Sequence, residues 1–293
     1  MYEVLEPANL KQLELLKLKS QRRFLGSRQG GNVSLKRGHG MEFADYRRYE
    51  LGDDPRYIDW GVYGRTERLY VKQFQEEQDI TVFCVLDSTA SMHHPEGDRK
   101  IRRATEVALG MLYVALSHHD RVHITIPGHT ALGPSSGAGF IHRIAELCSN
   151  LPMIAPDDHK RGLQRFLHSV EYPGICLYIS DFFLPIGEFQ AQLEALYTHN
   201  LDVIAIRVTG DHDHDPSISG DRALFIDSET GTELPLQWSA SMAREYAFRF
   251  AEHERVLREV TAKYQMHFFS HRASDPLMEF FCRKLAGTGV LRS

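Results

Sequence analysis

From residue 79 onward, short apolar runs rich in β-branched residues alternate with longer amphipathic stretches. The apolar runs have the length and composition of strands buried on both faces of a parallel sheet; they cover 80–87, 121–128, 175–181, 201–208, 223–229 and 265–270. The intervening stretches predict helices over 99–119, 140–150, 158–170, 187–199, 241–264 and 276–286. This alternation predicts an α/β fold with a doubly wound, mostly parallel sheet of the Rossmann type.

The first 78 residues follow a different pattern. Leucines spaced by three predict a helix over 10–20, with Asn9 as its N-cap. The glycine-rich stretch 26–40 predicts a loop or hairpin, and it is not a phosphate loop because no Gly-Lys-Ser/Thr follows. Residues 41–75 are dense in aromatics and charges, and we expect extended segments with a turn at 52–55. We therefore divide the chain into a helical, strand-rich extension (1–78) and an α/β domain (79–293).

Composition places the chain among ordinary globular proteins, with 42% hydrophobic and 25% charged residues and a net charge of −5. The charge is uneven: residues 10–48 hold ten Lys/Arg and three acids, whereas residues 49–79 hold four and eight. A basic arm could contact phosphate, but no aromatic residues interleave with it. We therefore expect the two stretches to complement each other, and nucleic-acid binding is disfavoured.

The sequence features that indicate a cellular compartment favour a soluble, cytoplasmic protein. No apolar run approaches the roughly 20 residues that a membrane helix needs, and the N-terminus lacks the layout of a signal peptide. Four dispersed cysteines form no CxxC pair, and we expect them to be reduced core residues; they are Cys84, Cys148, Cys176 and Cys282.

Two of the predicted strands end in aspartate, at Asp87 and Asp181. Right-handed crossovers place the carboxyl ends of parallel strands at one edge of the sheet, where ligands bind. Asp87 opens D-S-T-A-S, in which Asp87, Thr89 and Ser91 are spaced by two. A turn can bring these oxygens together for Mg²⁺, which prefers six oxygen ligands at about 2.0–2.1 Å. The alternative is that these side chains cap the following turn or helix.

The D-x-S-x-S arrangement resembles the metal-ion-dependent adhesion site of von Willebrand factor A domains, with Thr89 in place of the usual serine. A longer match lies at 42–60, which is similar to the E-F-x-x-x-R-x-Y-x-x-G-D-D-x-R-x-I-D-W signature of the DUF58 family. The segment D-S-E-T-G at 227–231 also resembles that family. The likeness spans nearly the whole chain.

The resemblance implies a cytoplasmic adaptor that binds proteins through a divalent metal, Mg²⁺ or alternatively Mn²⁺ or Ca²⁺, without enzymatic activity. It also implies a MoxR-type AAA+ ATPase as partner, acting on an unidentified client protein in maturation or remodelling. We expect the signature region to orient the domain on that ATPase through Arg47, Tyr49, Asp53, Asp54, Arg56, Asp59 and Trp60.

The resemblance further implies a metal set of Asp87, Thr89, Ser91 and Asp181. Adhesion sites normally add a threonine from the loop before the third long strand. Here that region, 155–167, contains no threonine. Either an acid replaces it, for which Asp158 is our candidate, or the ligand set is incomplete.

Two other chemistries are weighed against the adaptor. His93 and His94 could join the run Asp211–Asp215 in a transition-metal site, although a solvated polar loop is the preferred interpretation of that run. A metal-dependent phosphoester hydrolase could use the same aspartates to activate water. The sequence contains no H-E-x-x-H motif, which favours the adaptor.

Overall fold

The computed structural model describes residues 2–20, 41–76, 81–215, 222–226, 232–237 and 239–292. The chain forms two compact units, one of residues 1–24 and 80–293 and the other of residues 25–79. The N-terminal helix therefore belongs to the α/β unit, whereas the division at residue 78 placed it with the extension. Leu13 of this helix and Val4, just before it, are buried in the core of the α/β unit, which is the reason for the difference.

A six-stranded sheet in the order β11-β8-β7-β4-β5-β6 forms the centre of the larger unit. Its strands are β4 (Thr81–Leu86), β5 (Arg121–Ile126), β6 (Thr130–Ser135), β7 (Gly174–Ser180), β8 (Leu201–Thr209) and β11 (His267–Arg272). Neighbours pair in parallel except β5 and β6, which are antiparallel. The predicted α/β fold with a mostly parallel sheet is confirmed. Strand β6 lies between the predicted strand 121–128 and the predicted helix 140–150, where no strand was predicted: its Gly133 and Pro134 weaken the strand signal, and an edge strand tolerates both.

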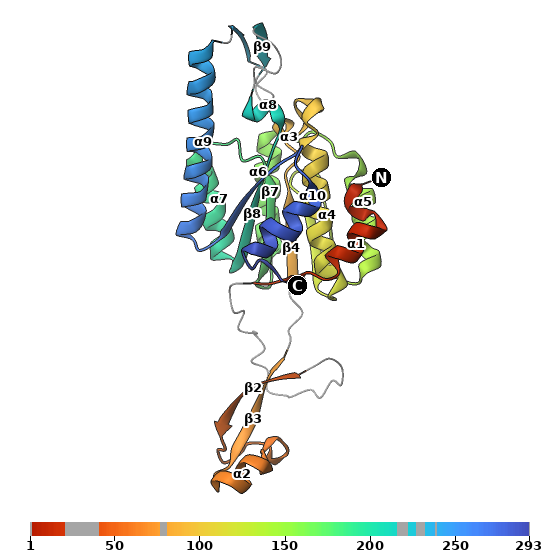
Figure 1. Ribbon diagram of the computed structural model, residues 1–293, viewed down its shortest axis with the longest axis vertical. Coiled ribbons are helices and arrows are strands. Elements are labelled where there is room, and N and C mark those ends of the chain that lie inside the picture. Colours follow the sequence, from red (N-terminus) through yellow and green to blue (C-terminus); the bar gives the residue numbers. More distant parts are fainter. Residues whose placement is uncertain are drawn as a thin grey trace. The chain divides into compact units, whose positions relative to one another are not determined.

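Helices cover both faces of this sheet (Figure 1). One core cluster joins α1 (Pro7–Leu13), α4 (Lys100–Ser117), α5 (Ile141–Leu147), α10 (Leu277–Glu279) and the π-helical segment η7 (Phe280–Leu285). The other joins α6 (Pro156–Ser169), α7 (Ile186–Thr198) and α9 (Ala240–Lys263). Within β4, Cys84 belongs to the first cluster and Val85 to the second. Alternate residues therefore feed opposite cores, as a doubly wound sheet requires.

The first helix is shorter than expected. It ends at Leu13, and β1 (Lys17–Leu18) then pairs antiparallel with β12 (Leu291–Arg292). Leu16 and Leu18 are buried while Lys17 is exposed, and only an extended chain places residues two apart on the same face. The leucine spacing predicted a helix because it could not reveal this pairing partner.

Two further elements lie beyond β8. A short helix, α8 (Asp211–His214), stands where we expected a polar loop. Strands β9 (Arg222–Ile226) and β10 (Glu233–Gln237) form a separate antiparallel pair, so the strand predicted at 223–229 does not join the main sheet. The D-S-E-T-G segment lies outside the described residues.

The smaller unit is a hairpin of β2 (Met41–Arg48) and β3 (Tyr70–Glu76). The expected turn is present, with Gly52 at a φ of 111°. Extended chain was expected throughout, but α2 (Trp60–Thr66) follows the turn. The side chain of Asp59 accepts hydrogen bonds from the amides of Gly61 and Val62, which caps this helix.

The remaining short elements include α3 (Ala90–His93), directly after the Asp87 turn. The 3₁₀ turns are η1 (Glu3–Leu5), η2 (Pro55–Tyr57), η3 (Glu96–Asp98), η4 (Ala138–Phe140) and η5 (Cys148–Asn150). All four cysteines are free, as predicted, but Cys282 is exposed and not part of the core. In the described part of the chain, every helix is too short or too polar to cross a bilayer.

Candidate metal centre

Asp87 and Asp181 follow two adjacent parallel strands, β4 and β7, at their carboxyl ends. Their exposed fractions are only 6% and 2%. Burial raises the pKa of Asp181, and the neighbouring Asp87 carboxylate raises it further, while Lys100 opposes both effects. Two acidic groups that share a poorly solvated edge favour a cation between or beside them.

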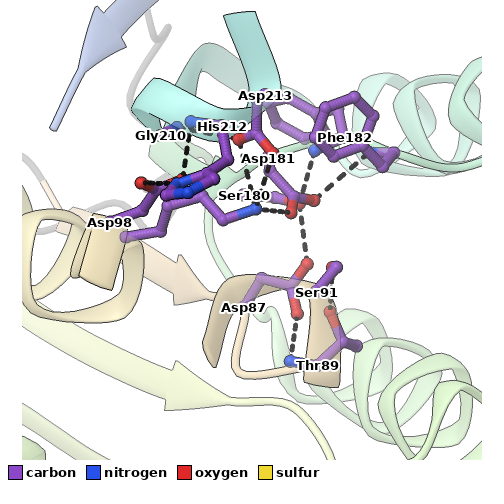
Figure 2. A network of polar contacts seen from close by, with 12 residues as sticks. Asp87, Thr89, Ser91, Asp98, Ser180, Asp181, Phe182, Gly210, His212 and Asp213 are labelled. Carbon is purple, nitrogen blue, oxygen red and sulfur yellow. Dashed lines mark hydrogen bonds and ion pairs between the residues drawn. The ribbon is translucent and has the colours of Figure 1, made fainter. Parts of the chain in front are cut away.

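The turn after β4 orients the Asp87 carboxylate (Figure 2). One oxygen accepts a hydrogen bond from the Thr89 amide at 2.8 Å, and the other accepts from the Ser180 hydroxyl at 2.7 Å. The hydroxyls of Thr89 and Ser91 lie 3.2 Å apart. Asp87 therefore caps its own turn, as the alternative interpretation of the sequence expected, yet the hydroxyls of Thr89 and Ser91 remain beside it.

A neighbouring loop holds this turn in place. The Ser88 hydroxyl donates to the Pro152 carbonyl at 2.7 Å, and the Ile154 amide donates to the Ser88 carbonyl at 2.8 Å. Thr89 and Ile154 also form an isolated parallel bridge. Residues more than 60 positions apart thus fix the geometry, which the spacing D-S-T-A-S alone does not reveal.

Lys100 is a site residue that sequence reasoning missed. Its ammonium lies 3.3 Å from an Asp181 oxygen and 3.1 Å from an Asp213 oxygen, and its side chain is only 2% exposed. The chain therefore carries its own cation at Asp181. Lys100 begins α4 within a run of basic residues, and nothing in that run distinguishes it from its neighbours.

The run Asp211–Asp215 does not gather around a metal. His212 binds Asp98 at 2.7 Å, and a side chain on Gly210 would place its Cβ 2.0 Å from an Asp98 oxygen. Among the described residues, no three His, Cys, Asp or Glu side chains are grouped to hold a metal ion. The alternative site with His93 and His94 is therefore not found, and the run packs as helix α8 against the end of the sheet.

Asp158, the expected substitute for the missing threonine, does not face Asp87. Its side chain is half exposed and pairs with Arg161 at 2.6 Å. The next residue, His159, is 6% exposed, and its Nδ1 lies 3.3 Å from an Asp87 oxygen. The rotation of helix α6 explains why His159, and not Asp158, faces Asp87, because residue 159 lies on the same face of the helix as the buried Leu163 and Phe166. That rotation was readable in the sequence.

The donors around Asp87 could hold a divalent cation. Adjacent ligands on an octahedral ion with bonds of about 2.1 Å lie roughly 3.0 Å apart. The hydroxyl pair at 3.2 Å and the Asp87–His159 pair at 3.3 Å are close to that spacing. Moreover, Nδ1 of His159 is buried without a hydrogen-bond partner. These two close pairs are compatible with a metal at Asp87, whereas Lys100 already neutralises Asp181.

Arg207 secures the other side of this edge. Its Nε donates to the Asp181 carbonyl at 3.0 Å, and the guanidinium lies over the rings of Phe183 and Phe250, 5.0 and 4.6 Å from their centroids. Burial lowers the pKa of Arg207. The segment after β7 is thereby tied to α9.

Helix α6 approaches the turn after β5 so closely that only glycine fits. A Cβ on Gly162 would lie 2.0 Å from the backbone nitrogen of Gly128. We expect Gly162→Ala to destabilise the protein by about 1–3 kcal/mol, because backbone cannot yield as a side chain does. Urea denaturation measures the change. In Gly187→Ala, where no atom lies within 4 Å, stability is expected to stay or rise, by at most about 1 kcal/mol; equal losses in both variants would contradict this account.

The predicted docking residues pair mainly with one another. Arg47 binds Asp53 at 2.6 Å, and this contact lowers the pKa of Asp53. Asp59 has a lowered pKa because Lys72 and Tyr46 bind its carboxylate.

Arg56 binds Asp54 at 2.6 Å in the same way. Exposed pairs of this kind add little stability; they order a surface on which Trp60 is 62% exposed and Leu51 fully exposed. Tyr49 is half-buried.

These features define an α/β protein with buried aspartates at the carboxyl edge of a mostly parallel sheet. The chain belongs to the DUF58 family, described as a protein family of unknown function, whose family profile matches residues 45–256. Uncharacterized proteins of Mycobacterium bovis and Mycobacterium tuberculosis are each 24% identical over 249 residues, covering 82% of this chain and 77% of theirs.

Two solved structures are also similar. One is a conserved hypothetical protein, BatB, from Bacteroides thetaiotaomicron, with 11% identity and a TM-score of 0.42 over 72% of this chain and 98% of the other. The second is an aerotolerance-related membrane protein from Bacteroides fragilis, with 12% identity and a TM-score of 0.41 over the same shares.

Proposed function

We propose that this protein is a non-enzymatic, divalent-metal-dependent interaction module of the von Willebrand factor A kind. The observation that carries the proposal is the Asp87 turn: a single carboxylate, oriented by Thr89 and Ser180, beside two neutral hydroxyls. Few anionic ligands leave a bound metal with residual positive charge. Such a metal attracts a carboxylate from another protein.

The proposed partner is a MoxR-type AAA+ ATPase in the cytoplasm, and the acidic ligand would come from a client protein that the pair matures or remodels. The signature region supports a docking role because its charges are paired while Trp60 and Leu51 stay exposed. Exposed aromatic residues ringed by ordered polar groups are common at interface centres. When Mg²⁺ or a related divalent ion is bound, it supplies the Lewis acidity that holds the client's carboxylate.

Metal titration of the purified full-length chain tests the proposal. After chelator treatment, Mg²⁺ and Mn²⁺ are expected to bind at one saturable site by calorimetry. Asp87→Ala is expected to abolish binding, because it removes the carboxylate that lies beside the two hydroxyls. Asp158→Ala is the matched control, since that carboxylate pairs with Arg161 at the surface, and it should bind as the wild type does.

Two further measurements separate adaptor from enzyme. A MoxR-type ATPase mixed with the wild-type chain should be retained on an affinity column, whereas the hydrolase alternative predicts turnover of p-nitrophenyl phosphate. Metal-dependent turnover that Asp87→Ala abolishes would refute the non-enzymatic proposal.

A further inference from the structure

A buried imidazole lies beside the Asp87 carboxylate with one nitrogen unused. His159 is 6% exposed, its Nδ1 lies 3.3 Å from an Asp87 oxygen, and that nitrogen makes no hydrogen bond. Burying a polar nitrogen without a partner costs about 1–3 kcal/mol. A ligand that satisfies this nitrogen would recover that cost.

The opposite nitrogen of the ring indicates which tautomer is present. The Tyr178 hydroxyl donates to Gln192 at 2.9 Å, so its oxygen is free to accept. His159 Nε2 lies 3.5 Å from that oxygen and can only donate to it. The proton of a neutral ring therefore sits on Nε2, and the Nδ1 lone pair faces the Asp87 carboxylate. Two acceptors that face each other are stabilised by a cation.

The ring is also held rigidly in this position. Leu163 and Phe166, on the same face of α6, are buried in the core, and Gly162 contacts the backbone of Pro127 and Gly128. The start of α6 cannot move away from Asp87 without breaking these contacts. A ligand held on a packed helix is preorganised for its metal.

We propose that His159 is a nitrogen ligand at the site of Asp87, Thr89 and Ser91. The proposal rests on the proposed metal site and specifies its chemistry. Imidazole binds first-row transition ions well, whereas Mg²⁺ and Ca²⁺ select oxygen ligands. The site therefore takes Mn²⁺, Fe²⁺ or Zn²⁺ in preference to Mg²⁺ or Ca²⁺. The imidazole takes the place of the threonine hydroxyl that adhesion sites normally add from this region of the chain.

Electron spin-echo spectroscopy of the full-length chain loaded with Mn²⁺ tests this directly. We expect modulation from a directly bound imidazole nitrogen in the wild type. His159→Thr, which offers a hydroxyl instead, should lose that modulation and lower the preference for Mn²⁺ over Mg²⁺ by about tenfold or more. His94→Ala is the matched control: His94 is exposed beside the same turn, and the variant should keep the nitrogen signal.

The outcomes distinguish this inference from the proposed function. If Mn²⁺ binds in an Asp87-dependent manner without a nitrogen signal, the assignment of His159 is wrong and the metal-dependent module stands. If Mn²⁺ does not bind at all, both are wrong. The wild-type spectrum decides even if His159→Thr fails to fold.

Discussion

Replacing Lys100 with methionine is expected to destabilise the metal-free protein by about 3–5 kcal/mol, the usual cost of removing one partner of a buried ion pair. The Lys100 ammonium lies between the carboxylates of Asp181 and Asp213, and its side chain is 2% exposed. Without it, two acidic groups remain close together and poorly solvated. Methionine keeps the unbranched apolar stem of lysine and removes the ammonium, so the loss reports mainly charge rather than packing.

Urea denaturation with and without MnCl₂ measures the effect. The metal is expected to raise the unfolding midpoint of Lys100→Met more than that of the wild type, because Asp181 then lacks its ammonium and gains most from another cation. Arg102→Met is the matched control. Arg102 lies on the same helix, but its side chain is half exposed and 3.7 Å from Glu106, which keeps a closer partner in Arg103 at 3.1 Å. We therefore expect its loss to cost at most about 1 kcal/mol.

A Lys100→Met variant as stable as the wild type would show that Asp181 and Asp213 do not depend on this ammonium. If the variant loses stability but MnCl₂ does not raise its unfolding midpoint, then Lys100 is the cation that Asp181 binds and a metal ion does not replace it. The second result would separate Asp181 from the metal set and leave Asp87, Thr89 and Ser91 as its core.

The second large effect concerns pH. His271 on β11 is 2% exposed and packs on Phe280, with ring centroids 4.6 Å apart. Burial, with help from nearby Arg103 and Lys284, lowers its pKa from 6.5 to about 4. The folded state therefore binds a proton on this ring less readily than the unfolded state. Its contribution to stability is complete above pH 6.5 and is lost as the pH falls towards 4.

The size of this pH effect follows from the pKa shift of His271, since one pKa unit corresponds to about 1.4 kcal/mol. We expect His271→Leu to reduce the loss of unfolding free energy between pH 7 and pH 4 by about 3 kcal/mol relative to the wild type. His129→Gln is the control, because that ring is exposed and solvated in both states. Parallel pH profiles for the wild type and His271→Leu would contradict the assignment.

Local pattern was sufficient for most of the architecture. The strand ending in Asp87 and the helix that became α4 were predicted within a few residues, because buried strands and amphipathic helices leave distinct periodicities. The turn at 52–55 also formed as its glycine and proline indicated. Errors came where pairing overrode pattern, as when residues 17–18 joined the C-terminal strand instead of extending a helix.

The residues of the candidate site likewise divide into those that local pattern revealed and those that it did not. Asp87 and Asp181 were readable because both follow apolar runs and parallel topology brings such ends together. Asp158 was chosen by composition, whereas the phase of α6 turns His159 inward. Lys100 left no signal, since its environment comes from strand ends and a helix more than 80 residues away.

The sequence by itself thus determined the α/β class, the edge of the sheet where the carboxylates gather, and the D-S-T-A-S turn, all of which depend on local periodicity and strand direction. Only the tertiary structure decided which charges meet at that edge. Side-chain contacts there join residues far apart in the chain, and their partners depend on how each helix is rotated and packed. For that reason an ammonium faces Asp181 and an imidazole faces Asp87.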